Sequence, residues 1–413
     1  MDAPLVQRGV DRVAQRVRLL VRERPLLVGW PAPAARTRRR AFQENAVQEP
    51  RPAPSLLTVD DFERAARARL SKMAYDYYRS GADEGRTLRE NRNAFRRLQI
   101  HYRVLVDVAE RDMSVTLLGT TVPFPILVAP TAYQRLAHPD GEIASSRAAS
   151  ELGTIFTLST LSTTSLEAVA EASPGPKWFQ LYVHKDRGLT RALVERAESA
   201  GYRALMLTVD TPLLGRRIAD VRNGFALPEG LAMANLLDVA AAAPASERGS
   251  LLAAYVASRH DASLTWRDVE WLGSITRLPI LLKGIIRPDD AVRALGAGAA
   301  GVVVSNHGAR QLDGAPATIE VLPAIADAVA GRCLVLMDGG VRWGTDVLKA
   351  IALGARAVLV GRPVLWGLAA LGGEGVARVL GGLRDELSMA MALAGCPTLA
   401  SVDRDLIRRA QAR

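Results

Sequence analysis

The chain of 413 residues is 49% hydrophobic and 23% charged, which is the composition of a globular protein with one large domain or two smaller ones. Its net charge of +10 is uneven, because residues 1–50 hold ten arginines and five acidic residues, and no zinc-finger or RNA-binding motif occurs, so no nucleic-acid partner is expected. Two distant cysteines without a Cys/His cluster exclude structural zinc, c-type haem and a disulfide framework, and no apolar run of about 18 residues indicates a membrane-spanning helix, so we expect a cytoplasmic protein with reduced thiols.

Residues 1–54 differ in composition from the rest of the chain. Val6, Val10, Val13 and Val17 recur at helical spacing, with arginines on the other face, and the Pro- and Arg-rich stretch "WPAPAARTRRR" follows. We expect a basic, mobile N-terminal extension. The alternative is an amphipathic helix that makes weak contact with a membrane surface or a partner. Its apolar stretch "PLLVGW" is too short for a signal peptide.

From residue 125 onward, short apolar runs alternate with helical patterns. The runs lack strict alternation of apolar and polar residues, which is typical of strands buried on both faces. Eight of them over about 250 residues predict an α/β fold, a (β/α)8 TIM barrel over residues 55–403, followed by a C-terminal tail of residues 404–413. The alternative, a doubly wound open sheet, usually carries a G-x-G-x-x-G motif that "PILVAPTAYQ" lacks. The predicted strands are 125–130, 154–159, 178–183, 204–210, 279–284, 301–306, 334–339 and 357–362.

One connection of this barrel is too long for a simple link. Residues 212–265 join the fourth and fifth predicted strands and include "AAAAPASERGS". Long loops in compact domains are usually functional or mobile. We therefore expect a long lid loop after strand 4, at the carboxyl end of the barrel.

Polar and charged residues stand at the ends of the predicted strands. The carboxyl ends of barrel strands meet at one face, where active sites form. One such residue alone is more often structural than catalytic, but polar groups at all eight strand ends predict a shared site. These residues are Thr131, Ser159, Gln180, Tyr182, Thr208, Asp210, Lys283, His307, Arg310, Asp338, Arg342, Gly361 and Arg362.

The last two strands end in a pattern that suits an anion. "DGGVRWG" and "GRP" combine glycines, backbone N–H groups and arginines after the seventh and eighth strands. Phosphate groups bind at this position in such barrels. The sequence therefore predicts a phosphate-bearing ligand across the mouth of the barrel, within reach of Lys283.

These motifs resemble the family of FMN-dependent 2-hydroxy acid oxidases and dehydrogenases, which includes glycolate oxidase, lactate oxidase, mandelate dehydrogenase and hydroxymandelate oxidase. The resemblance extends from about Thr58 to about Ser401. It implies FMN as the cofactor, no metal, and a homo-oligomer, either a tetramer or an octamer. It rests on "YDYYRSGADEGRTLRENRNAF", "APTAYQRLAHPDGE", "FQLYVHKDR", "LTVDTPLLGRR", "LLKGI", "SNHGARQLDG" and "DGGVRWGTDVLKAIALGARAVLVGRP".

The resemblance also implies a role for each site residue. His307 would be the catalytic base, which suits an imidazole with an ordinary pKa of about 6.5, and Asp210 would pair with it. The other catalytic residues would be Tyr77, Tyr182 and Lys283. The substrate would contact Arg310, Arg217, Tyr77, Tyr182, Leu161 and Tyr133. The cofactor would contact Pro130, Thr131, Ala132, Ser159, Gln180, Thr208, Lys283, Ser305, Asp338, Gly339, Gly340, Arg342, Gly361 and Arg362.

Three residues depart from the family pattern. Leu161 stands where glycolate-type members often have Trp, Tyr133 stands where some have Met, and Trp343 replaces an arginine of the phosphate rim. The first two line the expected substrate side, which favours a medium-chain or aromatic, mandelate-like substrate over glycolate.

We therefore expect FMN-dependent oxidation of an L-2-hydroxy acid to the 2-oxo acid, with O2 as acceptor and H2O2 as product. The first alternative is a dehydrogenase of the same family that passes electrons to a quinone or a protein. The others are a different FMN or phosphate barrel, such as an isomerase, and an Arg-rich binding protein that uses residues 1–54.

Overall fold

The computed structural model of the chain describes residues 56–236, 256 and 258–410. The chain divides into two units, Met1–Pro54 and Ser55–Arg413, and every described residue belongs to the second. The division falls where the composition changes. The extension predicted for residues 1–54 and the central part of the predicted lid lie outside the described residues.

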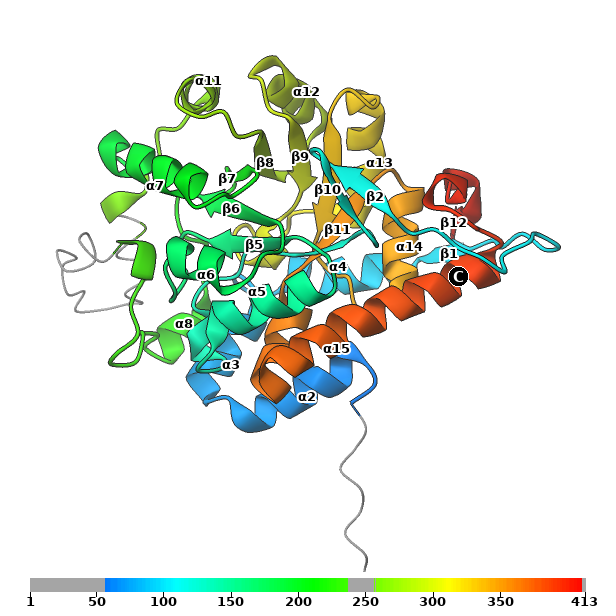
Figure 1. Cartoon of the computed structure of the whole chain (residues 1–413), viewed down its shortest axis with the longest axis horizontal. Coiled ribbons are helices and arrows are strands. Elements are labelled where there is room, and N and C mark those ends of the chain that lie inside the picture. The colour runs from blue at the N-terminus through cyan, green and yellow to red at the C-terminus, as the bar shows by residue number, and fades with distance from the viewer. Residues whose placement is uncertain (1–55, 237–255, 257, 411–413) are drawn as a thin grey trace, which may run out of the picture. The chain divides into compact units, whose positions relative to one another are not determined.

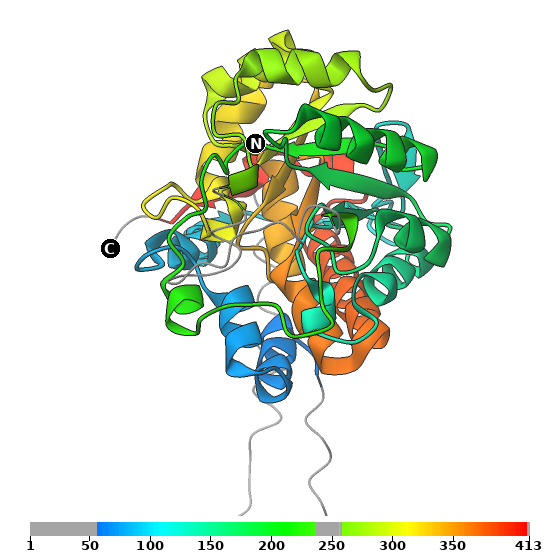
Figure 2. The same ribbon diagram turned by 90° about the vertical axis from the view of Figure 1, so that its left-hand side faces the viewer.

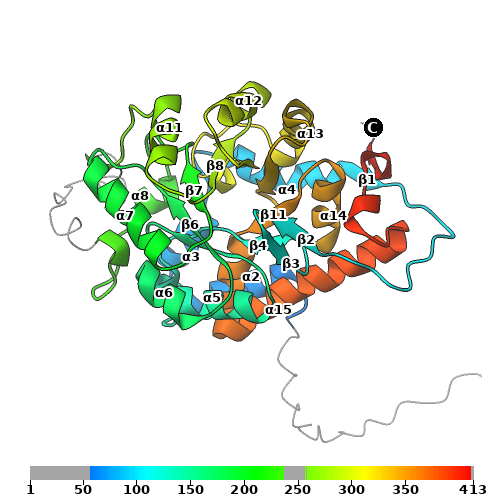
Figure 3. The ribbon, with the colours of Figure 1, turned by 45° about the horizontal axis from the view of Figure 1, so that its top comes forward.

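Eight parallel strands form a closed barrel in the order β10–β11–β4–β5–β6–β7–β8–β9 (Figures 1 and 3). Each coincides with one of the eight apolar runs, so the predicted (β/α)8 barrel is confirmed. The strands are β4 (Ile126–Val128), β5 (Phe156–Ser159), β6 (Lys177–Leu181), β7 (Leu205–Thr208), β8 (Ile280–Ile285), β9 (Gly301–Val304), β10 (Leu334–Asp338) and β11 (Ala357–Val360).

Helices follow the strands and surround the barrel (Figure 2). Local capping defines several of their starts: the Asp186 carboxylate accepts hydrogen bonds from the backbone N–H groups of Gly188 and Leu189 at the start of α7. The helices are α5 (Gly141–Glu151), α6 (Leu166–Ala172), α7 (Arg187–Ser199), α8 (Ile218–Arg222), α11 (Trp266–Ser274), α12 (Pro288–Gly296), α13 (Thr318–Val329), α14 (Gly344–Ala352) and α15 (Arg362–Ala394). Short 3₁₀ helices are η1 (Gln134–Leu136), η2 (Ala234–Leu236), η3 (His307–Ala309), η4 (Leu399–Ser401) and η5 (Arg404–Leu406).

The barrel strands are apolar throughout because both of their faces are buried. Along each strand, successive side chains point alternately into two separate hydrophobic clusters. The outer cluster joins the strands to the helices. The inner cluster contains Trp178, Met206, Leu281, Val303, Leu336 and Leu359, together with Val115, Leu117 and Val122 of the hairpin β2 (Val115–Leu117) and β3 (Thr120–Val122). This hairpin therefore closes the amino end of the barrel and leaves the carboxyl end for a site.

The chain before β4 adds α2 (Val59–Arg69), α3 (Lys72–Arg79), α4 (Arg86–Arg96) and β1 (Leu98–Ile100). Strand β1 pairs antiparallel with β12 (Ile407–Arg409). This pairing corrects the predicted tail of residues 404–413, because residues 404–409 form η5 and β12 within the same unit as the barrel. The three-residue strand was too short to recognise in the sequence.

Helix α15 is long and apolar enough to cross a membrane by length and composition, but 67% of its most apolar window is buried inside the protein. It contacts α2, α5 and α14, and α2 and α5 lie along it in Figure 1. Leu371 and Gly372 have non-helical dihedral angles and divide it into two segments. Its burial and its contacts with other helices are typical of a core helix of the barrel domain.

The turn after β10 depends on two glycines. Gly339 and Gly340 have φ angles of +96° and +85°, and a Cβ atom at Gly340 would stand 1.9 Å from the backbone oxygen of Asn91 in α4. Residues other than glycine are disfavoured by this backbone conformation. The turn and α4 can therefore lie in direct contact only because residue 340 has no side chain.

We predict that Gly340→Ala destabilises the protein by about 1–3 kcal/mol more than Gly298→Ala, because only the first substitution also introduces a steric clash. Gly298 is the matched control, since its φ is +82° and a Cβ there would meet nothing within 4 Å. Equilibrium unfolding in urea measures both. Equal losses of stability in the two variants would contradict the clash.

Candidate active site

Inside the barrel, a layer of polar side chains follows the layer of apolar side chains, on the side of the carboxyl ends of the strands. Because strand side chains alternate, the residue two positions after each inner apolar residue also faces the interior. Met206 is followed by Thr208, Leu281 by Lys283, Val303 by Ser305, and Leu336 by Asp338. The floor of the site is thus built on the barrel strands, and His307, Arg310 and Arg217 come from the segments that follow strands.

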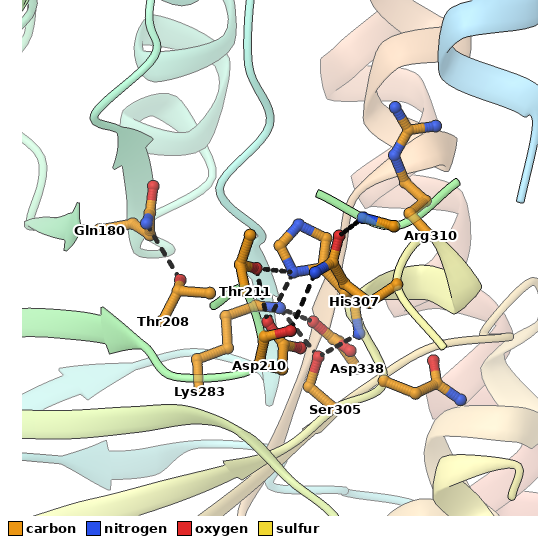
Figure 4. A network of polar contacts seen from close by, with 12 residues as sticks. Gln180, Thr208, Asp210, Thr211, Lys283, Ser305, His307, Arg310 and Asp338 are labelled. Carbon is orange, nitrogen blue, oxygen red and sulfur yellow. Dashed lines mark hydrogen bonds and ion pairs between the residues drawn. The ribbon is translucent and has the colours of Figure 1, made fainter. Parts of the chain in front are cut away.

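His307 forms the centre of this polar layer. It begins η3, directly after β9, with a φ of +59°. Its Nδ1 lies 2.8 Å from Oδ1 of Asp210 and 3.4 Å from Oγ1 of Thr211, and Figure 4 shows these contacts. Burial lowers the pKa of His307 below its ordinary value, against the opposing effect of Asp210. Burial raises the pKa of Asp210. The effects of His307, Lys283 and Thr211 are larger together and bring this pKa below its ordinary value. The pair therefore consists of a neutral imidazole and a carboxylate at neutral pH.

Lys283 occupies a second polar cluster next to this pair. Its Nζ lies 2.8 Å from Oδ2 of Asp338 and donates to Oγ of Ser305 at 2.8 Å (Figure 4). Both charged side chains are almost fully buried. Burial disfavours the ammonium, but Asp338 and Asp210 outweigh it and raise the pKa of Lys283 above its ordinary value. The strand ends therefore hold a permanent positive charge in the floor of the site.

Two arginines and a tyrosine form one wall. Arg310 donates from Nη1 to the carbonyl oxygens of Tyr77 and Ser80, and its guanidinium lies 4.8 Å from the centre of the Tyr77 ring. Arg217 is buried, and its Nε donates to the carbonyl oxygen of Arg310 at 3.4 Å. Burial and the neighbouring Arg310 lower the pKa of Arg217 to about 10, so it remains charged at neutral pH. Two cations this close favour an anionic ligand such as a carboxylate.

Uncharged hydrogen-bonding groups also line the cavity. Gln180 donates to Oγ1 of Thr208 at 3.0 Å and accepts from Ser159 at 3.3 Å. Burial raises the pKa of both Tyr77 and Tyr182, so both phenols remain protonated donors. A flat polar ligand can lie across these groups.

Two buried polar atoms near the glycine turn have no hydrogen-bond partner among the residues that the structure describes. They are Nε of Arg342 and Oδ1 of Asp338, and both side chains line the cavity with Gly339, Gly340, Gly361 and Arg362. Burial lowers the pKa of Arg342 to about 10, which leaves it charged at neutral pH. An unpaired guanidinium donor suits a phosphate and an unpaired carboxylate oxygen suits a hydroxyl group, so these residues fit the expected FMN. Arg362 instead donates to the carbonyl oxygens of Tyr78, Gly308 and Ser80.

One cavity joins these groups. It has an empty volume of about 1130 Å³, part of it open to solvent. Of the predicted site residues, the structure brings to its lining Tyr77, Pro130, Thr131, Ala132, Ser159, Leu161, Gln180, Tyr182, Thr208, Arg217, Lys283, His307, Arg310, Asp338, Gly339, Gly340, Arg342, Gly361 and Arg362. Asp210 and Ser305 lie directly behind His307 and Lys283.

Tyr133 is not among the residues that line the cavity, and its contact with the substrate stays a prediction. Its side chain is 2% exposed, and its ring packs 5.7 Å from that of Tyr77 and 6.2 Å from that of Phe225. Tyr133 is the N-cap residue of η1 and has a φ of +59°. It supports Tyr77 from behind. Trp343 is also absent from the cavity wall and is 44% exposed.

Several contributors to the site were missed in the sequence. Asn91 and Asn306 exchange side-chain hydrogen bonds of 2.9 and 2.8 Å, which tie α4 to the residue before His307. Val256 and His260, from the end of the long connection, line the cavity. Asn306 stands in the motif around His307, but no sequence signal pairs it with Asn91 across more than 200 positions.

His184 and His260 lie beside the cavity as a buried pair. Burial lowers the pKa of His184 to about 4, with Asp186 opposing this effect and Arg259 adding to it. Burial and the neighbouring His184 lower the pKa of His260 to about 3. In the unfolded chain both would titrate at about 6.5, so below that pH the unfolded state binds more protons.

We predict that this pair makes the protein lose stability as the pH falls from about 6.5 toward 4, by up to about 1.4 kcal/mol per pH unit for each histidine. The double variant His184→Phe/His260→Phe should lose less stability over the same interval. Urea unfolding of both proteins at pH 7.5 and 5.0 measures the difference. Identical losses would show that the histidines do not cause the acid sensitivity.

Comparisons with known proteins identify relatives over the whole barrel. The profile of the FMN-dependent dehydrogenase family matches residues 66–409. Glycolate oxidase 3 of Arabidopsis thaliana is 53% identical over 355 residues, which are 86% of this chain and 96% of that protein. An L-lactate oxidase of a Nostoc species is 52% identical over 358 residues, which are 86% of this chain and 98% of that protein.

Solved structures agree with the sequence relatives. A crystal structure of mandelate oxidase with (S)-4-hydroxymandelic acid superimposes with a TM-score of 0.82 at 46% identity, over 86% of this chain and 99% of that one. The family match covers most of the chain, and the residues at the carboxyl end of the barrel fit the cofactor that the family uses. The chain therefore belongs to the family of FMN-dependent dehydrogenases and is an FMN-dependent oxidoreductase.

Proposed function

We propose that the protein oxidises an L-2-hydroxy acid to the 2-oxo acid and passes the electrons to O2, which yields H2O2. The observation that carries this proposal is the His307–Asp210 pair, in which His307 lines the same cavity as two arginines suited to a carboxylate. Glycolate, lactate and mandelate oxidases among the relatives support the same substrate class.

The side chains suggest how the substrate is held. Arg310 and Arg217 bind its carboxylate, because both guanidinium groups line the cavity and act on the Tyr77 phenol. The phenols of Tyr77 and Tyr182 donate hydrogen bonds to substrate oxygens. Together, these contacts with the arginines and the phenols orient the carbon that carries the hydroxyl group toward His307.

His307 then removes a proton from the substrate. Asp210 holds Nδ1, so Nε2 is the ring nitrogen that accepts the proton. The lowered pKa of His307 keeps the imidazole neutral and able to accept at neutral pH, and the Asp210 carboxylate stabilises the imidazolium that forms. Bound FMN supplies the capacity to take up the two electrons of the substrate. Lys283, held charged by Asp338, stabilises the negative charge that accompanies them.

The acceptor and the assembly are further parts of the proposal. Oxygen is favoured because the named relatives are oxidases, and the alternative is a quinone or a protein acceptor. We propose a homotetramer; self-association is supported by the exposed side chains of Tyr102, Val104 and Leu105 and of Met389 and Leu393, because the N–H of Arg103 donates to the carbonyl oxygen of Ala394 at 3.1 Å and so joins the two segments. A cytoplasmic location fits the two free thiols, Cys333 and Cys396.

Substrate size follows from Leu161. The Leu161 side chain lines the cavity. The backbone N–H of Leu161 donates to Oγ of Ser159 at 3.1 Å, so Leu161 lies next to Ser159, one of the expected cofactor contacts. A leucine fills less of the cavity than the tryptophan of glycolate-type members. We therefore propose a medium-chain or aromatic 2-hydroxy acid, since each buried CH₂ group of such a substrate contributes about 0.8 kcal/mol.

We predict that the purified protein is yellow and that an L-2-hydroxy acid bleaches it without oxygen. His307→Ala should keep its FMN and be reduced about 10²–10⁴-fold more slowly, because it loses the base but no group that we place at the cofactor. Anaerobic stopped-flow absorbance measures the rate. Near-normal reduction of the variant would remove His307 from this role, and a colourless folded protein would contradict the function.

A second prediction concerns the substrate side chain. The kcat/KM of the natural protein should be higher for 2-hydroxyoctanoate or mandelate than for glycolate, with about 10–200-fold between well and poorly fitting substrates. Leu161→Trp should shift the preference toward glycolate, and Leu161→Met, of similar size, is the control. The proposed role of Leu161 in substrate size is contradicted if glycolate is already the best substrate of the natural protein, or if Leu161→Trp leaves the order of kcat/KM among the substrates unchanged.

A further inference from the structure

Tyr182 has a stacking partner that comes from a distant part of the chain. The ring of His260 lies 4.5 Å from that of Tyr182, centre to centre, with 28° between the planes. His260 is 3% exposed and lines the same cavity as Tyr182. The ring of His184 meets His260 edge to face, at 5.6 Å and 89°. His260 is therefore held between two rings at the edge of the site.

The backbone around His260 fixes it in this place. His260 forms an antiparallel bridge with His184, which follows β6 by three residues. The N–H of Lys185 donates to the carbonyl oxygen of Arg259 at 2.9 Å, and the N–H of Asp261 donates to that of Val183 at 3.3 Å. These bonds attach the end of the β7–β8 connection to the segment that carries Tyr182.

An ion pair strengthens this attachment. Nη2 of Arg187, at the start of α7, lies 2.6 Å from Oδ2 of Asp261 and 2.8 Å from Oδ1 of Asp268. Both carboxylates belong to the chain that follows His260. The position of His260 is thus set by contacts outside the cavity, which a ligand does not need to create.

The electrostatic setting indicates what His260 can do. Burial and His184 keep the His260 ring neutral at the pH at which the enzyme would work. A neutral ring presents an uncharged face to Tyr182 and does not repel the arginines of the cavity. It suits stacking and does not suit proton uptake near neutral pH.

We propose that His260 is a positioning residue that holds the phenol of Tyr182 in its substrate-binding orientation by ring stacking and takes no part in proton transfer. This inference rests on the proposed function, in which Tyr182 donates to a substrate oxygen. Without the stacked ring, the phenol would sample orientations that do not reach the substrate.

The test compares the anaerobic rate of flavin reduction by the best 2-hydroxy acid in four proteins. Relative to the natural protein, His260→Leu should be slower on the order of tenfold, and His260→Phe, which retains a ring, should stay within about twofold. Tyr202→Phe is the matched control for loss of a buried phenol, because the hydroxyl of Tyr202 donates to the carbonyl oxygen of Leu166 and Tyr202 does not line the cavity. Equal rates of His260→Leu and His260→Phe would overturn the stacking role.

Two further measurements separate positioning from general damage. In the Tyr182→Phe background, His260→Leu should have little additional effect, since it acts through the missing hydroxyl. The dissociation constant of the 2-oxo acid product, measured by calorimetry, should change less than the rate, because the arginines still bind the carboxylate. Fully additive effects, or a pH profile of reduction that differs between His260→Phe and the natural protein, would contradict the proposal.

The same experiments distinguish this inference from the proposed function. If no 2-hydroxy acid reduces the natural protein, the proposed function itself fails. If the natural protein is reduced and His260→Leu is reduced at the same rate, only this inference fails.

Discussion

The alternation of side chains along the barrel strands is the constraint on which the rest of the structure depends. Every second residue faces the interior, and the interior must be filled. At the amino end Trp178, Leu281 and Leu336 fill it, and the β2–β3 hairpin covers them. Two residues further along the same strands the interior becomes polar. The positions of Gln180, Lys283 and Asp338 follow from that geometry, so the barrel itself sets the floor of the site.

Burying charges at this depth requires that they be paired. Lys283 contacts Asp338 and Ser305, and His307 contacts Asp210. Each pair offsets the cost of burial for its members. Arg342 and Asp338 nevertheless keep one unpaired buried atom each, at the positions where the phosphate and hydroxyl groups of FMN would bind. These two atoms are therefore ones that the cofactor can satisfy.

Much of this arrangement could be predicted from sequence, because the eight apolar runs and the polar residues after them are local signals. Contacts between distant segments could not. Nothing in the sequence pairs Asn91 with Asn306, or stacks His260 on Tyr182. For Tyr133 the family resemblance implies a place in the substrate pocket, but it does not show that the ring packs against that of Tyr77. Strand β12 was missed because three residues carry too little pattern.

The central claim is that Asp210 tunes His307 as the base of the reaction. The pH dependence of anaerobic flavin reduction in Asp210→Asn tests it most directly. Removing the carboxylate leaves the imidazolium without its counter-charge, which lowers the pKa of His307 further and slows proton removal. The account predicts a lower limiting rate and an apparent pKa shifted to lower pH, with FMN still bound. A variant with the limiting rate and pH profile of the natural protein would contradict it.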